Sequence, residues 1–254
     1  MNQAPCVSVP LPAHVHEGLA LLVSRSTDGL TKKDKAMGID LLTDAYCHVI
    51  DHILVSLLDE ISNRYESRQI TEARRMAEQV KQKARHYIPW AGGFISAKRL
   101  PPVIAYFNSL VYQIDDDHHI TVPISASVAE RSNAIIASLK TGKAEDLTEG
   151  VALLSQVIDH LIGPLVIEPK NLLRFNFVVN KTLDGVIGLL HSLITRSLGK
   201  FGRKVDPDLY PLIGSHLGRF LVVERSLIQL CYLTHLLTTT PHRGGLNQHY
   251  PSSR

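Results

Sequence analysis

The stretch from Thr31 to Ile61 constrains the fold of this chain more than any other. Its apolar residues recur every three or four positions, at Ile39, Leu42, Tyr46, Val49, Ile53 and Leu57. That spacing places them on one face of an α-helix, which has about 3.6 residues per turn. Thr31 followed by Asp34 is typical of a capping box at a helix start. We therefore expect a long amphipathic helix that buries one continuous stripe.

Further helical patterns follow, most of them bounded by proline, glycine or a capping residue. We expect helices at 14–25, 71–86, 103–114, 127–141, 146–162, 170–198 and 206–237. The strand-like alternation from Ile120 to Ile124 is too short and isolated to support a sheet. The predicted fold class is therefore all-α, a multi-helix bundle of about eight helices.

The length of 254 residues and the hydrophobic share of 44% suit a single domain with a sizeable core. We expect an irregular lead at 1–13, an all-α domain at 14–240 and a flexible tail at 241–254. The tetrapeptide VIDH at Val49 returns at Val157, which suggests pseudo-repeats at 28–122 and 128–240. A second register, which aligns His48 with His160, competes with the first, so duplication and chance similarity both stay open.

The charge balance and the cysteines limit the cellular compartment and the kinds of partner that can be expected. Lys and Arg number 27 against 24 Asp and Glu, an excess too small to indicate nucleic-acid binding unless the basic residues cluster. Three widely spaced cysteines favour reduced thiols. No uncharged apolar run reaches the length of a transmembrane helix, since Phe220 to Leu237 contains Glu224 and Arg225. We expect a soluble cytoplasmic protein without a transmembrane segment.

Two histidines give the sharpest candidate for a metal site. His48 and His52 are four residues apart and share a helix face, with Asp59 two turns further on and His160 available from another helix. This set predicts a divalent metal in a metal-dependent helical enzyme. The competing interpretation is a polar surface or a helix interface, because the three residues lie about a third of a turn away from the buried stripe.

Two basic helix ends form the second candidate site, for anions or nucleic acid. The first comprises Arg74, Arg75, Lys81, Lys83, Arg85 and the neighbouring Trp90, and the second comprises Arg196, Lys200, Arg203 and Lys204. The competing interpretation is a solvated helix face, since the helix dipole favours cations near a C-terminus.

No catalytic motif and no phosphate-binding glycine loop occurs in the chain, so we predict no catalytic residue and no cofactor beyond the metal alternative. The leading expectation is a non-catalytic helical interaction or regulatory protein, with a protein partner or self-association as a homo-oligomer. The stretches 172–198 and 212–237 support it, because a helix that is apolar around most of its circumference must be covered. Nucleic acid is the less favoured partner.

Overall fold

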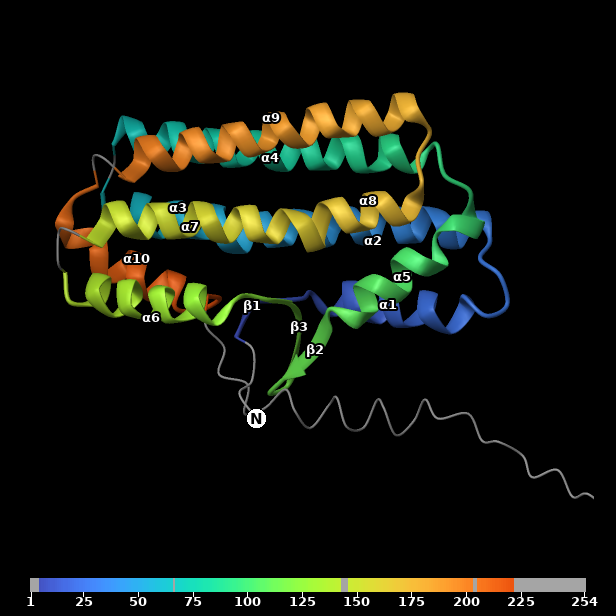
Figure 1. Cartoon of the computed structure of the whole chain (residues 1–254), viewed down its shortest axis with the longest axis horizontal. Coiled ribbons are helices and arrows are strands. Elements are labelled where there is room, and N and C mark those ends of the chain that lie inside the picture. The colour runs from blue at the N-terminus through green and yellow to red at the C-terminus, as the bar shows by residue number, and fades with distance from the viewer. Residues whose placement is uncertain (1–4, 66, 143–145, 203–204, 222–254) are drawn as a thin grey trace, which may run out of the picture.

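The computed structural model describes residues 5–221, apart from 66, 143–145 and 203–204. Within these residues the chain forms eight helical runs and one small sheet, which confirms an all-α multi-helix bundle. The helices lie in three layers (Figure 1). We call α4 and α9 the outer layer, and the long helices beneath them the middle layer. The sheet and four shorter helices form the lower layer.

The first half of the chain contains α1 (Ala13–Arg25), α2 (Lys32–Ile50), the π segment η1 (Asp51–Val55), α3 (Ser56–Ser62), α4 (Arg68–Gly92), the 3₁₀ turn η2 (Ala97–Arg99) and α5 (Pro101–Ser109). The second half contains α6 (Ala126–Lys140), α7 (Asp146–Ile162), the π segment η3 (Gly163–Ile167), α8 (Glu168–Leu173), α9 (Phe177–Gly202), the 3₁₀ turn η4 (Pro207–Leu209) and α10 (Tyr210–Leu217). The strands are β1 (Cys6–Pro10), β2 (Val111–Ile114) and β3 (Asp117–Pro123).

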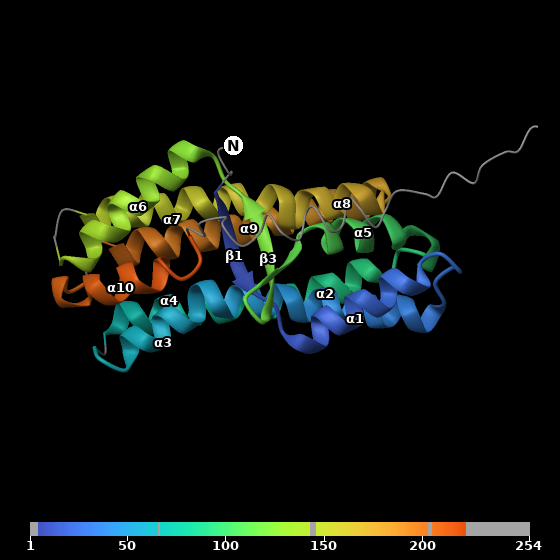
Figure 2. The same ribbon diagram turned by 90° about the horizontal axis from the view of Figure 1, so that it is seen from below.

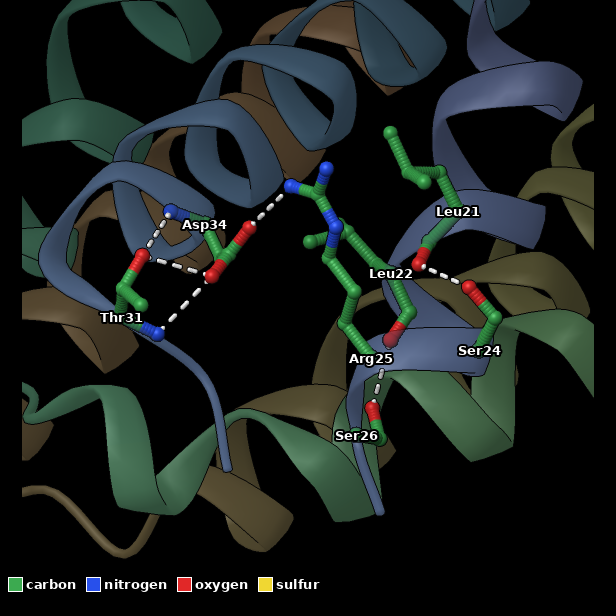
Figure 3. A network of polar contacts seen from close by, with 7 residues as sticks. All are labelled: Leu21, Leu22, Ser24, Arg25, Ser26, Thr31 and Asp34. Atoms are coloured by element: carbon green, nitrogen blue, oxygen red, sulfur yellow. Dashed lines mark hydrogen bonds and ion pairs between the residues drawn. The ribbon is translucent and has the colours of Figure 1, made fainter. Parts of the chain in front are cut away.

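The predicted capping box at the start of α2 is present (Figure 3). The Thr31 hydroxyl accepts from the Asp34 amide at 3.2 Å, and the Asp34 carboxylate accepts from the Thr31 amide at 2.9 Å. Arg25, at the end of α1, donates to the same carboxylate at 2.7 Å. The Thr31 hydroxyl also donates to the Asp34 carboxylate, at 2.6 Å. This hydrogen bond, followed by those from the Thr31 amide and from Arg25, lowers the pKa of Asp34 to about 2. The network therefore fixes the turn between α1 and α2 as well as the helix start.

The long helix predicted at 31–61 runs from Lys32 to Ser62 without a break, because α2 passes through η1 into α3. The helix predicted to stop at Gly163 and Pro164 also continues, through η3 into α8. A π segment changes the local hydrogen-bond spacing, so the chain accommodates Pro164 there without ending the helix. The end comes at Arg174, which adopts a left-handed conformation with φ of 48°.

The expectation that residues 120–124 cannot support a sheet is wrong. β3 lies between β1 and β2 in an antiparallel sheet, and Ile120 is opposite both Val9 and Val111. Its partner β1 falls within the stretch expected to be irregular, more than a hundred residues earlier in the chain. The predicted helix 103–114 correspondingly ends at Ser109, and its last residues form β2. Pairing over such a distance leaves no local signal in the sequence.

The order of elements in the first half recurs in the second. A strand, a helix, a long helix with a π segment, another long helix and a short helix occur as β1 to α5 and again as β3 to α10. The sheet lies near the middle of the molecule, with α1 and α5 on one side and α6 and α10 on the other (Figure 2). The pseudo-repeats at 28–122 and 128–240 stay a prediction, and the element order favours boundaries before β1 and β3 instead.

The expectation of no transmembrane segment is wrong. Among the described residues, three helical segments are long and apolar enough to cross a membrane, namely Lys32–Ser62, Leu147–Leu173 and Phe177–Arg196. They escaped the sequence criterion because we required an uninterrupted run without charges, whereas these segments contain a few charged residues. The third is by far the least covered, since only 6% of its apolar window is buried.

The predicted helix 206–237 is observed as α10 over Tyr210–Leu217. The helix ends at Leu217, and residues 218–221 form turns, so the prediction is wrong over those four residues. The predicted stretch 222–237 and the predicted tail at 241–254 lie outside the described residues.

Candidate functional site

A cavity of about 320 Å³ lies between the outer and middle layers. Its walls come from α4 and α9 on one side and from α2 and the α7–η3–α8 run on the other, with α1 and α5 at one end. Figure 1 shows how the outer layer extends along the helices beneath it. The cavity is therefore built by helices from both halves of the chain.

Apolar side chains make up almost the whole lining. Five of the residues that predicted the stripe on α2 face this space, namely Ile39, Leu42, Tyr46, Val49 and Ile53. α9 contributes Val186, Ile187 and Leu190 from the opposite wall. The cavity thus accounts for the apolar residues on one side of α9.

Five polar or amphipathic side chains contribute to the lining, namely Tyr46, Lys83, Tyr87, Lys170 and His191. Lys170 is ion-paired with Asp184, and His191 lies 2.5 Å from an oxygen of Asp159. Burial raises the pKa of Tyr46, with a smaller contribution from Tyr106, so its hydroxyl stays neutral.

Lys83 differs from the other two cationic residues of the lining. Its ammonium lies 5.9 Å from the centroid of the Tyr87 ring. Among the described residues, no carboxylate forms an ion pair with it. The lining therefore carries one cation that is available to an anionic group.

Ion pairs and one close approach hold the outer layer over the cavity. Lys81 donates to Asp51 of η1 at 2.6 Å, and this hydrogen bond raises the pKa of Lys81. Arg74 lies 3.0 Å from an oxygen of Asp59. Further along α4, the Ile39 side chain packs directly on Gly92, where an added Cβ would lie only 2.5 Å from the Ile39 Cδ1 atom. Contacts along α4 therefore hold this helix against the middle layer.

The predicted metal ligands are only partly brought together. His48 and His52 stack with ring centroids 6.1 Å apart, and the Nε2 atom of His48 is buried without a hydrogen-bond partner. Asp59 is ion-paired with Arg74, whereas the Nε2 atom of His160 donates to the Pro123 carbonyl at 2.7 Å. In the part of the chain that the structure describes, no three His, Cys, Asp or Glu side chains are grouped as a metal site.

The histidine pair has other neighbours. Phe220 lies 6.4 Å from the His52 ring, and His216 lies 5.6 Å from Phe220. Burial is the largest cause that lowers the pKa of both His52 and His216. The surroundings of His52 and His216 therefore favour the neutral form of these two rings.

The two basic helix ends are only partly brought together. α4 and α9 pack side by side in opposite directions (Figure 1). Ala73 and Met76 of α4 line a small pocket together with Ile194 of α9, so Arg74 and Arg75 lie on the part of α4 that is next to the Arg196 end of α9. Lys81, Lys83 and Arg85 lie further along α4, away from that end. Trp90 packs between Tyr87 and Phe94, with ring centroids at 6.0 and 5.1 Å. The Lys200 side chain and the whole of Arg203 and Lys204 lie outside the described part of the chain.

No protein-family model, curated protein or solved structure matches this chain. The fold and the site together define a layered helical protein with an apolar cavity, and the functional argument therefore starts from that cavity.

Sequence reasoning missed the cavity because its lining uses the same residue types as a core. A signal was present in the apolar stripes of two separate stretches, 39–53 and 183–194, which both exceed what one neighbouring helix can cover.

Proposed function

We propose that this chain is a non-catalytic binding protein that holds the hydrocarbon chain of a single-chain carboxylate, such as a fatty acid. The observation that carries the proposal is the cavity of about 320 Å³ with its apolar lining. Small-molecule sites typically enclose about 300–1,000 Å³. The volume thus suits one acyl chain of medium length and excludes a bulky multi-chain lipid.

The hydrophobic effect supplies the affinity. Each methylene transferred from water contributes about 0.8 kcal/mol, which corresponds to about fourfold in the dissociation constant. Affinity should therefore rise steadily with chain length until the cavity is filled, and then level off. A flat dependence on chain length is not compatible with this mode of binding.

Lys83 supports the assignment of the polar end group. It is the cation of the lining without an ion-pair partner among the described residues, whereas Lys170 and His191 already contact carboxylates. A charge-assisted hydrogen bond to an ionised acceptor is about twice as strong as a neutral one. A ligand carboxylate beside Lys83 would place the attached chain in the apolar space.

The cavity is tested with Val186→Trp, in which a large ring replaces a small side chain of the lining. We expect saturated carboxylates of increasing length to displace a fluorescent fatty-acid probe from the native protein, about fourfold better per methylene. The variant should bind the probe at least tenfold more weakly, because the ring occupies the ligand's place.

Thr182→Trp is the matched control, since Thr182 is exposed on the same helix. It should bind like the native protein, and thermal unfolding should show that both variants are folded. No probe binding to the native protein, or equal binding in both variants, would contradict the proposal.

The polar end is tested with Lys83→Met, which keeps an unbranched side chain but removes the charge. We expect this variant to lose about tenfold or more in affinity for the carboxylate, since a hydrogen bond to a charged group contributes about 1.5–3 kcal/mol. Its affinity for the corresponding alcohol should be unchanged, as measured by titration calorimetry. Lys181→Met serves as the control, because Lys181 is exposed on α9 and does not line the cavity. An equal loss of affinity for the acid and for the alcohol would contradict the proposed role of Lys83.

A further inference from the structure

The outer layer carries a net positive charge, whereas the rest of the chain carries a net negative charge. α4 and α9 together contain nine Lys and Arg against three Asp and Glu. The whole chain contains 27 against 24, so the excess of six on these two helices is offset by an excess of three negative charges elsewhere. A face that concentrates one sign of charge attracts surfaces of the opposite sign.

The same face exposes large apolar side chains. On α9, Phe177 is 76% exposed, Val178 71% and Leu189 51%. Phe94, directly after α4, is 51% exposed. A Cβ added at Gly185 or Gly188 would meet nothing within 4 Å, so this side of α9 is open. Exposed apolar residues gathered on one face mark an interaction surface.

Cations accompany these apolar residues. Arg75, Lys181 and Arg196 are exposed and have no ion-pair partner among the described residues. The Lys181 ammonium lies 5.5 Å from the centroid of the exposed Phe177 ring. By contrast, Arg74 and Lys81 of α4 are directed to carboxylates of the middle layer.

We propose that the outer face of α4 and α9 docks on an anionic lipid membrane, with α9 lying in the plane of the interface. Helices that bind in this way combine an exposed apolar face with flanking Lys and Arg. The segment Phe177–Arg196 has the length and apolarity of a membrane helix and is only 6% buried over its apolar window. The inference rests on the surface of the layer and not on what fills the cavity.

Charge decides between a membrane and the other occupants. A second copy of the chain would bring two positive faces together, which is unfavourable. Nucleic acid would satisfy the cations but would leave Phe177, Val178 and Leu189 against a polar backbone. An anionic bilayer matches both features, because its headgroups attract the cations and its acyl boundary accepts the apolar side chains.

The experiment is flotation of the full-length protein with vesicles of phosphatidylcholine alone, or of phosphatidylcholine with 30% phosphatidylglycerol. We expect binding to the anionic vesicles only, and its loss at high salt. Each cation near the surface contributes about 1 kcal/mol, so Arg75→Glu, Lys181→Glu and Arg196→Glu combined should weaken binding about one hundredfold or more. Phe177→Ser alone should weaken binding about tenfold.

The controls make the same chemical changes elsewhere. Lys32→Glu, Lys33→Glu and Arg131→Glu combined change the charge equally on the middle and lower layers. Leu21→Ser removes an exposed apolar side chain from α1, in the lower layer (Figure 1). Both controls should bind vesicles like the native protein, and all of the variants should unfold at similar temperatures.

Any of five results would overturn the proposal. The first is no flotation with anionic vesicles, and the second is flotation that survives the triple charge reversal. The third is a native protein that forms a dimer and becomes a monomer when the same three charges are reversed, which would assign the face to a second copy. Displacement from vesicles by single-stranded DNA, with the apolar variants unaffected, would assign it to nucleic acid. A protein that stays with the membrane in alkaline carbonate would span the bilayer instead of docking on it.

Discussion

At the scale of single residues, three histidines that are half-buried or buried set the response of this protein to pH. His52, His119 and His216 all have pKa values lowered mainly by burial. The charged groups around them act in both directions, since Glu60 raises the pKa of His216 while Arg219 lowers it. The Nε2 atom of His216 donates to the Ile53 carbonyl at 3.3 Å, and the Ser8 hydroxyl hydrogen-bonds to His119 at 2.8 Å. These rings therefore fit the fold in their neutral form.

Because the folded pKa values lie below the unfolded value near 6.5, the unfolded chain binds more protons as the solution is acidified. We expect the free energy of unfolding to be highest above pH 7 and to fall as the pH drops from about 7 to 5. Urea titrations at several pH values measure this slope. His52→Gln should flatten it, whereas His86→Gln, at an exposed position of α4, should leave it unchanged. A stability that rises on acidification over this range would show that the rings gain charge favourably.

At the scale of elements, the contacts between helices depend on a few small residues. A Cβ on Gly214 of α10 would lie 2.8 Å from the Leu139 Cβ and 3.0 Å from the Lys140 backbone nitrogen of α6. Neither atom belongs to a flexible side-chain end that can move aside. At Gly188 of α9, in contrast, nothing lies within 4 Å.

The two glycines therefore predict opposite effects of the same substitution. Gly214→Ala should lower the free energy of unfolding by about 1–3 kcal/mol, because inserting atoms into a packed contact forces the helices apart. Gly188→Ala should raise it by up to about 1 kcal/mol, because alanine has the higher helix propensity. Chemical denaturation of the two variants beside the native protein measures both. Equal effects of the same sign would contradict the packing of α10 on α6.

The starts of the helices could be read from the sequence better than their ends. Thr31 and Asp34 predicted the start of α2 because a capping box is a local device. Pro164 misled us, since a π segment allows the helix to continue. We did not predict that β3 belongs to a sheet, because its partner β1 is distant in the chain. Both errors, at Pro164 and at β3, arose where a tertiary contact or an unusual turn outweighed a local preference.

At the scale of the whole molecule, the two proposals concern opposite sides of one layer. The inner side of α4 and α9 closes the cavity, and the outer side carries the exposed apolar and basic residues. The sequence showed the basic residues of both helices but not their arrangement, because the packing of α4 on α9 depends on tertiary contacts. The cavity itself could not be predicted, since an apolar residue beside empty space has the same sequence signature as one in a packed core.

The sheet also affects the order in which the chain can fold during synthesis. Val7 of β1 pairs with Val122 of β3, so β1 has no partner strand until more than a hundred further residues have been made. The helices between these strands form mostly local contacts and can assemble as they emerge, whereas closing such a long loop is slow. A ribosome-bound chain that ends before residue 117 would therefore hold β1 unpaired, and the arrival of β3 is the step that gives it a partner.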